Sequence, residues 1–291
     1  MRKLLVVTGL LLSFLAGITR ADSSTKEYLN SARQSLEQGK KEDALAAATK
    51  AVDGDSKNPS CYATRAMIQD ARHDFEKAVA DYSRVIELMP NVVGGYQRRG
   101  EDYFRMGKFA ESVADFDKVI QLEPKREPYH WQRGISLYYA GEFERGARQF
   151  EGHKAVNPND VENAVWHYLC VARLSGIEKA RAGMIKIEGD SRVPMMRVYA
   201  MYLGTASAAD VLKEAETGEA TVEERKMRLF YAHLYIGLYQ EAAGQLDQAR
   251  EHILLAAQKY AGDDYMGDVA RVHETLLKHE KSPSSQAPRK Q

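Results

Sequence analysis

The chain has 291 residues, of which 44% are hydrophobic, and its 41 Lys and Arg residues balance its 41 Asp and Glu residues. Disorder requires low hydrophobicity together with high net charge, and neither applies here, so most of the length is expected to fold. Two Cys residues cannot supply a disulfide framework, and the balanced charge lacks the basic excess that binding to nucleic acid requires.

The first 21 residues resemble a secretory signal peptide. Two basic residues precede an apolar run at 4–15, and small residues occupy two of the three positions before a cleavage site. We expect cleavage after Ala21 and a secreted or periplasmic protein; the alternative is an uncleaved N-terminal anchor. A lipoprotein is not expected, because Ile18 stands where its Cys would be. No long hydrophobic segment follows, so no transmembrane segment is expected after signal removal.

A period of 34 residues runs through the next part of the chain. Pro90, Pro124 and Pro158 are separated by this step, and Gly100 and Gly134 keep it as well. A 34-residue unit with a small residue at position 8, Gly at 15, Ala at 20 and Pro at 32 resembles the tetratricopeptide repeat, a pair of antiparallel helices. The resemblance implies an all-α protein, built as a right-handed α-solenoid in which stacked units bury one continuous core.

The repeat frame also predicts the organisation of the chain. The expected parts in chain order are four complete units at 25–58, 59–92, 93–126 and 127–160, a degenerate fifth unit at 161–194, an irregular helical segment at 195–229, a sixth unit at 230–263, a capping helix at 264–281 and a disordered tail at 282–291. Small residues at positions 8, 20 and 27 are expected where two helices cross, because close approach leaves no room for larger side chains.

Three patterns predict helix starts. Asn58 precedes Pro59, Ser207 forms a pair with Asp210, and Thr221 precedes Glu224 by the three residues of a capping box.

No constellation of catalytic or metal-binding residues emerges from the sequence. His167 and Cys170 could offer two metal ligands, but a site needs three or four. The sequence contains no glycine-rich phosphate loop, nucleophile elbow or catalytic triad order. Cys61 and Cys170 fall three repeats apart, too far for a disulfide, so two buried thiols are expected. The chain is therefore expected not to be an enzyme and to need no metal or cofactor.

The inner surface of a tetratricopeptide superhelix is lined by the first helix of each unit, and the repeat frame identifies the residues. In chain order they are Gln97, Glu101, Phe104 and Arg105 of the third unit, Trp131, Ile135, Tyr138 and Tyr139 of the fourth, and Val165, Leu169 and Arg173 of the fifth. An aromatic centre with Arg nearby is typical of a protein or peptide binding groove. The alternative is that the superhelix closes on itself and these rings pack against the C-terminal helices.

Short aromatic and glycine patterns recur in the C-terminal half, in residues 166–169, 202–204 and 230–231. Together with the repeats, over roughly residues 25–280, they resemble the NlpI-type cell-envelope lipoproteins. The resemblance implies a periplasmic adaptor that forms homodimers and brings a tail-specific protease to peptidoglycan hydrolases. The missing lipoprotein Cys departs from that family and leaves an adaptor without a lipid anchor.

Two other functions remain open. A co-chaperone module that clamps an acidic peptide needs Lys and Asn where this chain has Leu29 and Arg33. An accessory subunit of an envelope enzyme or assembly complex would carry activity in residues 192–219, which contain no His or Cys. The function that we expect is an exported adaptor whose concave groove binds a protein or peptide partner.

Overall fold

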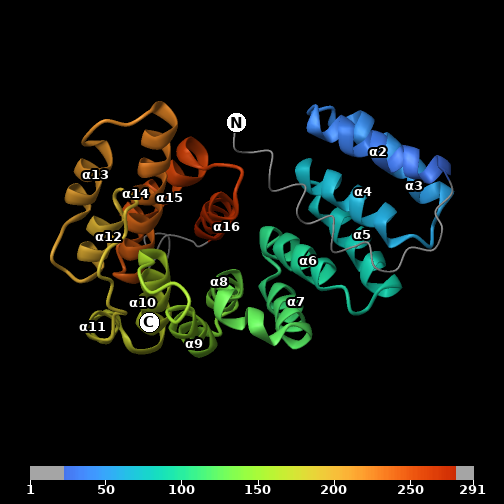
Figure 1. Cartoon of the computed structure of the whole chain (residues 1–291). Helices are drawn as coiled ribbons and strands as arrows, with labels where there is room; N and C mark the ends of the chain where they lie inside the picture. Colours follow the sequence, from blue (N-terminus) through green and yellow to red (C-terminus); the bar gives the residue numbers. More distant parts are fainter. Residues whose placement is uncertain (1–22, 280–291) are drawn as a thin grey trace, which may run out of the picture. The chain divides into compact units, whose positions relative to one another are not determined.

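The computed structural model describes residues 23–279, and every regular element in that range is a helix (Figure 1). The chain divides into two compact units: unit 1 ends at Arg126, and unit 2 begins at Glu127. None of the helices in the described range is long and apolar enough to cross a membrane. The predicted signal peptide at 1–21 and the predicted tail at 282–291 lie outside the described residues.

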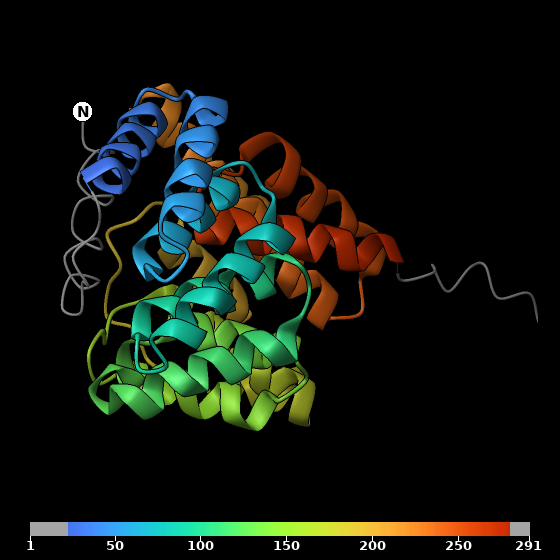
Figure 2. The same ribbon diagram turned by 90° about the vertical axis from the view of Figure 1, so that its right-hand side faces the viewer.

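Unit 1 consists of three helix pairs. Its helices are α2 Ser23–Glu37, α3 Lys41–Gly54, α4 Pro59–Ala71, α5 Phe75–Leu88, α6 Val93–Arg105 and α7 Phe109–Leu122. The contacts between helices are most extensive within the pairs α2 with α3, α4 with α5 and α6 with α7. Successive pairs stack through α3 with α4 and α5 with α6. Figure 2 shows the same helices in a second view.

Small residues allow the helices of a pair to approach closely. Ala32 of α2 and Ala44 and Ala48 of α3 are completely buried in one apolar cluster. The turn between the helices needs a left-handed backbone conformation, which Gly107 adopts after α6 with φ 72°. In the second pair His73 takes this conformation, with φ 61°. Asn58 caps α4 by accepting the backbone N–H of Ser60, as its place before Pro59 predicts.

Unit 2 contains the remaining helices. A 3-10 helix, η2 Pro124–Tyr129, crosses the boundary and is followed by α8 Trp131–Tyr139, α9 Phe143–His153, α10 Val161–Ser175, α11 Ile177–Ala182, α12 Met195–Tyr202, α13 Ala208–Glu216, α14 Val222–Ala242, α15 Leu246–Leu254, the π-helix η3 Leu255–Tyr260 and α16 Tyr265–His279. The predicted capping boxes begin α13 at Ser207 and α14 at Thr221.

The packing of unit 2 departs from simple pairing after α10. Helix α11 has six residues, and residues 183–194 contain no helix. As a result α10 contacts α9 and α11 and also α12 and α14. Cys61 in unit 1 and Cys170 on α10 are both buried free thiols, as expected. The prediction of an all-α solenoid of helix pairs is confirmed, and the irregular part of unit 2 brings its last helices near α8 and α10.

Candidate binding site

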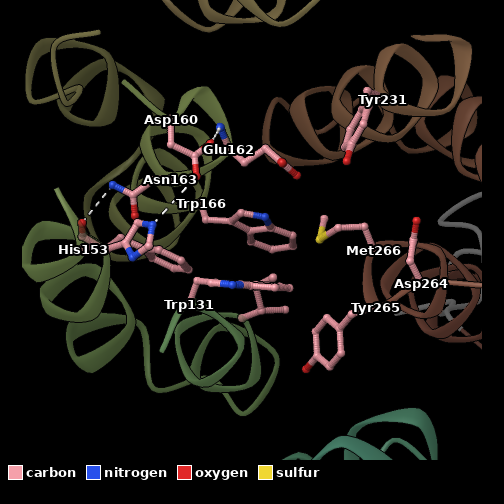
Figure 3. Close-up of a pocket in the computed structure, with 12 residues that line it drawn as sticks. Trp131, His153, Asp160, Glu162, Asn163, Trp166, Tyr231, Asp264, Tyr265 and Met266 are labelled. Carbon is pink, nitrogen blue, oxygen red and sulfur yellow. Dashed lines mark hydrogen bonds and ion pairs between the residues drawn. The ribbon is translucent and has the colours of Figure 1, made fainter. Parts of the chain in front are cut away.

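Unit 2 contains a cavity of about 360 Å³. Side chains from α8, α9, α10, α14 and the start of α16 line it (Figure 3). The aromatic members of this lining are Trp131, Phe150, Trp166, Tyr231 and Tyr265. Residues from helices more than 90 positions apart in the chain therefore meet at one hollow.

The two indole rings form one side of the cavity. Trp131 is the first residue of α8 and packs edge to face against Tyr265, with 5.3 Å between the ring centroids. Trp166 lies in the middle of α10 and is 2% exposed. Figure 3 shows both indoles facing Tyr231 and Met266, which come from α14 and α16. The chain has two Trp residues, so both of them line this cavity.

A network of charged groups forms the polar edge. Asp160 caps α10 by accepting the backbone N–H of Glu162, and Nη2 of Arg192 donates to Oδ1 of Asp160 at 2.7 Å. Arg192 also forms ion pairs with Glu162 and Asp190. The hydroxyl of Tyr235 donates to Glu162. These contacts hold both carboxylates of the first turn of α10 in place.

The surroundings shift the pKa values of the charged groups at this edge in different directions. Burial raises the pKa of Glu162, although the charge of Arg192 acts against this. Burial also opposes ionisation of Asp160, but its contact with His153 and the charge of Arg192 outweigh that effect, so the pKa of Asp160 is lowered. The pKa of His153 is raised, chiefly by the carboxylate of Asp160. Asp160 is therefore held as a carboxylate beside its cationic partners.

Two buried polar atoms at the cavity have no hydrogen-bond partner among the described residues. They are Nε1 of Trp166 and Oδ1 of Asn163. The side-chain amide of Asn163 donates to the carbonyl oxygen of Phe150 at 3.0 Å, and the residue is 4% exposed. Burying an unpaired polar atom costs about 1–3 kcal/mol, so both atoms lower the stability of the protein in the absence of a partner.

The side chain of Asp264 lies at the open end of the cavity. It is exposed, and its Oδ1 accepts the backbone N–H of Gly267 at the start of α16. Trp131 and Tyr231 are half-buried, whereas Ile135 and Phe150 close the inner end and are almost fully buried. A group that enters the cavity would therefore pass Asp264 and the two half-buried rings.

The structure distributes the predicted groove residues of unit 2 over different surroundings. Trp131 and Ile135 line the cavity. Tyr138 is buried against Trp166, and the hydroxyl of Tyr139 lies 3.0 Å from Nδ1 of His273 on α16. Tyr139 thus contacts a C-terminal helix, as the alternative interpretation expected, whereas Tyr138 packs against α10.

The groove residues that were predicted from the fifth repeat also differ in their surroundings. Val165 and Leu169 are buried in the core of unit 2. Arg173 is exposed, lies over the ring of Phe143 and has Nη1 3.8 Å from Glu241. Only Arg173 of these three presents its side chain to solvent.

The predicted groove residues of unit 1 interact with one another and with their neighbours. Gln97 donates to Glu101 at 2.9 Å, and Phe104 is completely buried beside Phe109. Arg105 forms ion pairs with Asp70 and with Asp102, at 2.8 and 2.7 Å. The three polar residues of this part of the predicted groove thus form hydrogen bonds or ion pairs, whereas Phe104 belongs to the core.

Several cavity residues escaped the sequence analysis. Asp160, Glu162 and Asn163 lie around the start of α10, and Tyr231, Asp264, Tyr265 and Met266 come from α14 and the start of α16. The predicted sixth repeat begins at residue 230, so the rule that the first helix of a repeat lines the inner surface could have identified Tyr231 on α14. The same rule gives no signal for the residues at the start of α16. The cap formed by Asp160 was the one local signal that could have drawn attention to this edge.

A second cavity of unit 2, of about 370 Å³, has the opposite charge. It lies among η2, α8 and α9, and its charged lining consists of Arg133, Arg145, Arg148 and Glu127. Within residues 23–279, no group of three or more His, Cys, Asp or Glu side chains is arranged to hold a metal ion.

Comparison with known families identifies one segment of unit 1. Residues 93–126, which contain α6 and α7, match the family model of the tetratricopeptide repeat. This segment is a tetratricopeptide repeat. No curated protein sequence matches the chain.

Solved structures share the fold at low sequence identity. A tetratricopeptide repeat protein from Parabacteroides merdae is 13% identical, with a TM-score of 0.58, and the match covers 89% of this chain and 100% of that one. The MamA protein is 14% identical, with a TM-score of 0.52 and coverage of 68% and 98%. MamA from Desulfovibrio magneticus RS-1 is 16% identical, with a TM-score of 0.51 and coverage of 56% and 92%. These similarities show a tetratricopeptide-type fold and do not confirm the NlpI-type resemblance.

Proposed function

We propose that the protein is a non-enzymatic scaffold that binds a partner protein, and that the cavity of unit 2 is the centre of the binding surface. The observation that carries the proposal is the cavity itself, a hollow of about 360 Å³ with aromatic walls and one polar edge. Hollows of this size and composition are typical of binding sites. Aromatic side chains also supply much of the contact energy in protein interfaces.

The contacts of the polar groups support recognition rather than catalysis. Asp160 and Glu162 are held by Arg192, and His153 is fixed between Asp160 and the carbonyl oxygen of Pro128. No Ser, Thr, Cys or Lys side chain is among the residues that line the cavity, so none of these four nucleophiles lies beside a general base there. A bound segment would meet fixed charges and rings, which suits a scaffold.

Export to the cell envelope is part of the proposal. The signal-like residues 1–21 support it, and the NlpI-type resemblance supports a tail-specific protease that acts with peptidoglycan hydrolases as the partner. Mass spectrometry of the protein recovered from the envelope fraction should then give Asp22 as the first residue. Recovery from the cytoplasm with residues 1–21 intact would contradict export.

The experiment that tests the proposed function is affinity capture from an envelope extract with the wild-type protein, Trp131→Ala and Tyr129→Ala. Trp131 lines the cavity, whereas Tyr129 is 62% exposed and lies outside it on η2. We expect Trp131→Ala to weaken capture of a specific partner by about 2 kcal/mol, the loss typical of a buried aromatic contact. Tyr129→Ala should retain wild-type capture.

Circular dichroism and melting must first show that both variants fold. If Trp131→Ala is unstable, Tyr231→Ala removes a ring from the opposite side of the same cavity. Equal capture by the wild type and a folded cavity variant would show that the cavity does not bind the partner.

A further inference from the structure

The polar edge of the cavity has more negative than positive groups. Arg192 is shared among Asp160, Glu162 and Asp190. His153 is the other basic group at this edge, with Nε2 3.8 Å from Asp160. Even a protonated His153 leaves the negative groups in excess. A ligand group that enters here is favoured when it is positively charged.

Asp264 adds a carboxylate at the open end. Its hydrogen bond is with a backbone N–H, and it forms no ion pair with any residue in the described range. Asp264 lines the same cavity as Glu162 and Asp160. The inner edge and the open end of the cavity thus both attract a cation.

The aromatic walls favour a cation for a separate reason. A guanidinium or ammonium group within about 6 Å of a ring face is attracted to the electrons of the ring. In Figure 3 the indoles of Trp131 and Trp166 lie on one side, and Tyr231 and Asp264 lie on the other. A planar group between these sides would have rings and a carboxylate within reach.

The buried polar atoms define the ligand further. Oδ1 of Asn163 and the carboxylate of Asp264 are acceptors, whereas Nε1 of Trp166 is a donor. Asn163 and Trp166 are both more than nine-tenths buried, and their unpaired atoms belong to side chains that line the cavity. A guanidinium group has five N–H donors and a flat shape that stacks on rings.

We propose that the cavity of unit 2 holds an arginine side chain of the partner protein. The inference rests on the proposed function, because it names the group of the partner that enters the site. The second cavity, lined by Arg133, Arg145 and Arg148, would repel the same group. Arginine recognition therefore belongs to the cavity with the two indoles.

The two indole N–H signals in a nitrogen–proton NMR spectrum provide a direct test, because both Trp residues of the chain line the cavity. The probe is N-acetylarginine methylamide, and the control is N-acetylcitrulline methylamide, which has the same shape without the charge. We expect arginine to shift both signals with a dissociation constant of about 1 mM, and citrulline to bind about tenfold more weakly or not at all.

A pair of variants tests the role of the charge. Asp264→Asn removes the charge at the open end and keeps an oxygen that can accept the N–H of Gly267. It should weaken binding of the arginine probe by about three- to tenfold. Asp263→Asn changes an exposed neighbour that does not line the cavity and should bind like the wild type.

The outcomes separate this inference from the proposed function. If citrulline binds as well as arginine, if arginine shifts neither indole signal, or if Asp264→Asn binds like Asp263→Asn, the arginine site is refuted. When partner capture still depends on Trp131 in that case, the proposed function stands without arginine recognition. When Trp131→Ala captures the partner as well as the wild type does, the proposed function fails and the inference fails with it.

Discussion

Asp102 of unit 1 is an acidic side chain with no exposed surface, and Arg105 links it to the carboxylate of Asp70. Nη1 of Arg105 donates to Oδ1 of Asp102 at 2.7 Å and to Oδ1 of Asp70 at 2.8 Å. Burial, and then the charge of Asp70, raise the pKa of Asp102 to about 8, although Arg105 acts in the other direction. Arg105 therefore does not outweigh the burial of Asp102 and the charge of Asp70, and the network retains a proton near neutral pH.

This proton makes stability depend on pH in a predictable direction. Because the folded-state pKa of Asp102 exceeds its unfolded value, its stabilising contribution is complete below about pH 4 and is lost as the pH rises towards about 8. Asp102→Asn cannot ionise, so its free energy of unfolding should fall less over this range, by about 1.4 kcal/mol for each unit of the raised pKa. Urea unfolding of the wild type and Asp102→Asn across this range measures the difference. If the free energies of unfolding of the wild type and Asp102→Asn changed in parallel with pH, Asp102 would not hold a proton in the folded state.

Within the fourth repeat, the crossing of α8 and α9 depends on the absence of a side chain at Gly134. A Cβ atom at this position would lie 2.6 Å from Cζ of Phe150, whose ring is buried. Gly134→Ala should therefore lower the free energy of unfolding by about 1–3 kcal/mol, because the ring cannot withdraw without disturbing the core.

Gly152, on α9, is the matched control. A Cβ atom there meets nothing within 4 Å, so Gly152→Ala should stabilise the helix by about 0.5–1 kcal/mol. Urea unfolding followed by circular dichroism measures both changes. If Gly134→Ala left the free energy of unfolding unchanged, the two helices could move apart without a loss of stability.

The same elements show how far the sequence predicts the structure. Periodicity and capping identified the helix pairs and the starts at Ser207 and Thr221, because these depend on residues close in the chain. The cavity depends on α14 and α16 lying near α8 and α10. That arrangement follows from the short α11 and the non-helical residues 183–194, where the repeat period no longer applies. The sequence analysis therefore named Trp131 and Ile135, which line the cavity, as groove residues and did not name Tyr231 or Asp264 among them.

At the scale of the whole molecule, the cavity belongs to unit 2 alone. All of its lining residues lie between Trp131 and Met266, after the boundary at Arg126. In repeat proteins each element is stabilised mainly by its immediate neighbours, so a local change need not spread along the chain. Matching substitutions in the two units can therefore separate stability from binding.

Gly100→Ala in unit 1 is the counterpart of Gly134→Ala, because a Cβ atom at Gly100 would lie 2.8 Å from the ring of Phe116. It should destabilise the protein to a similar degree, by about 1–3 kcal/mol. The indole NMR signals and the affinity for the arginine probe should nevertheless keep their wild-type values, measured well below the unfolding temperature. Gly134→Ala should shift the indole signals, because Phe150 lines the cavity. Shifted indole signals in Gly100→Ala would contradict the assignment of the cavity to unit 2 alone.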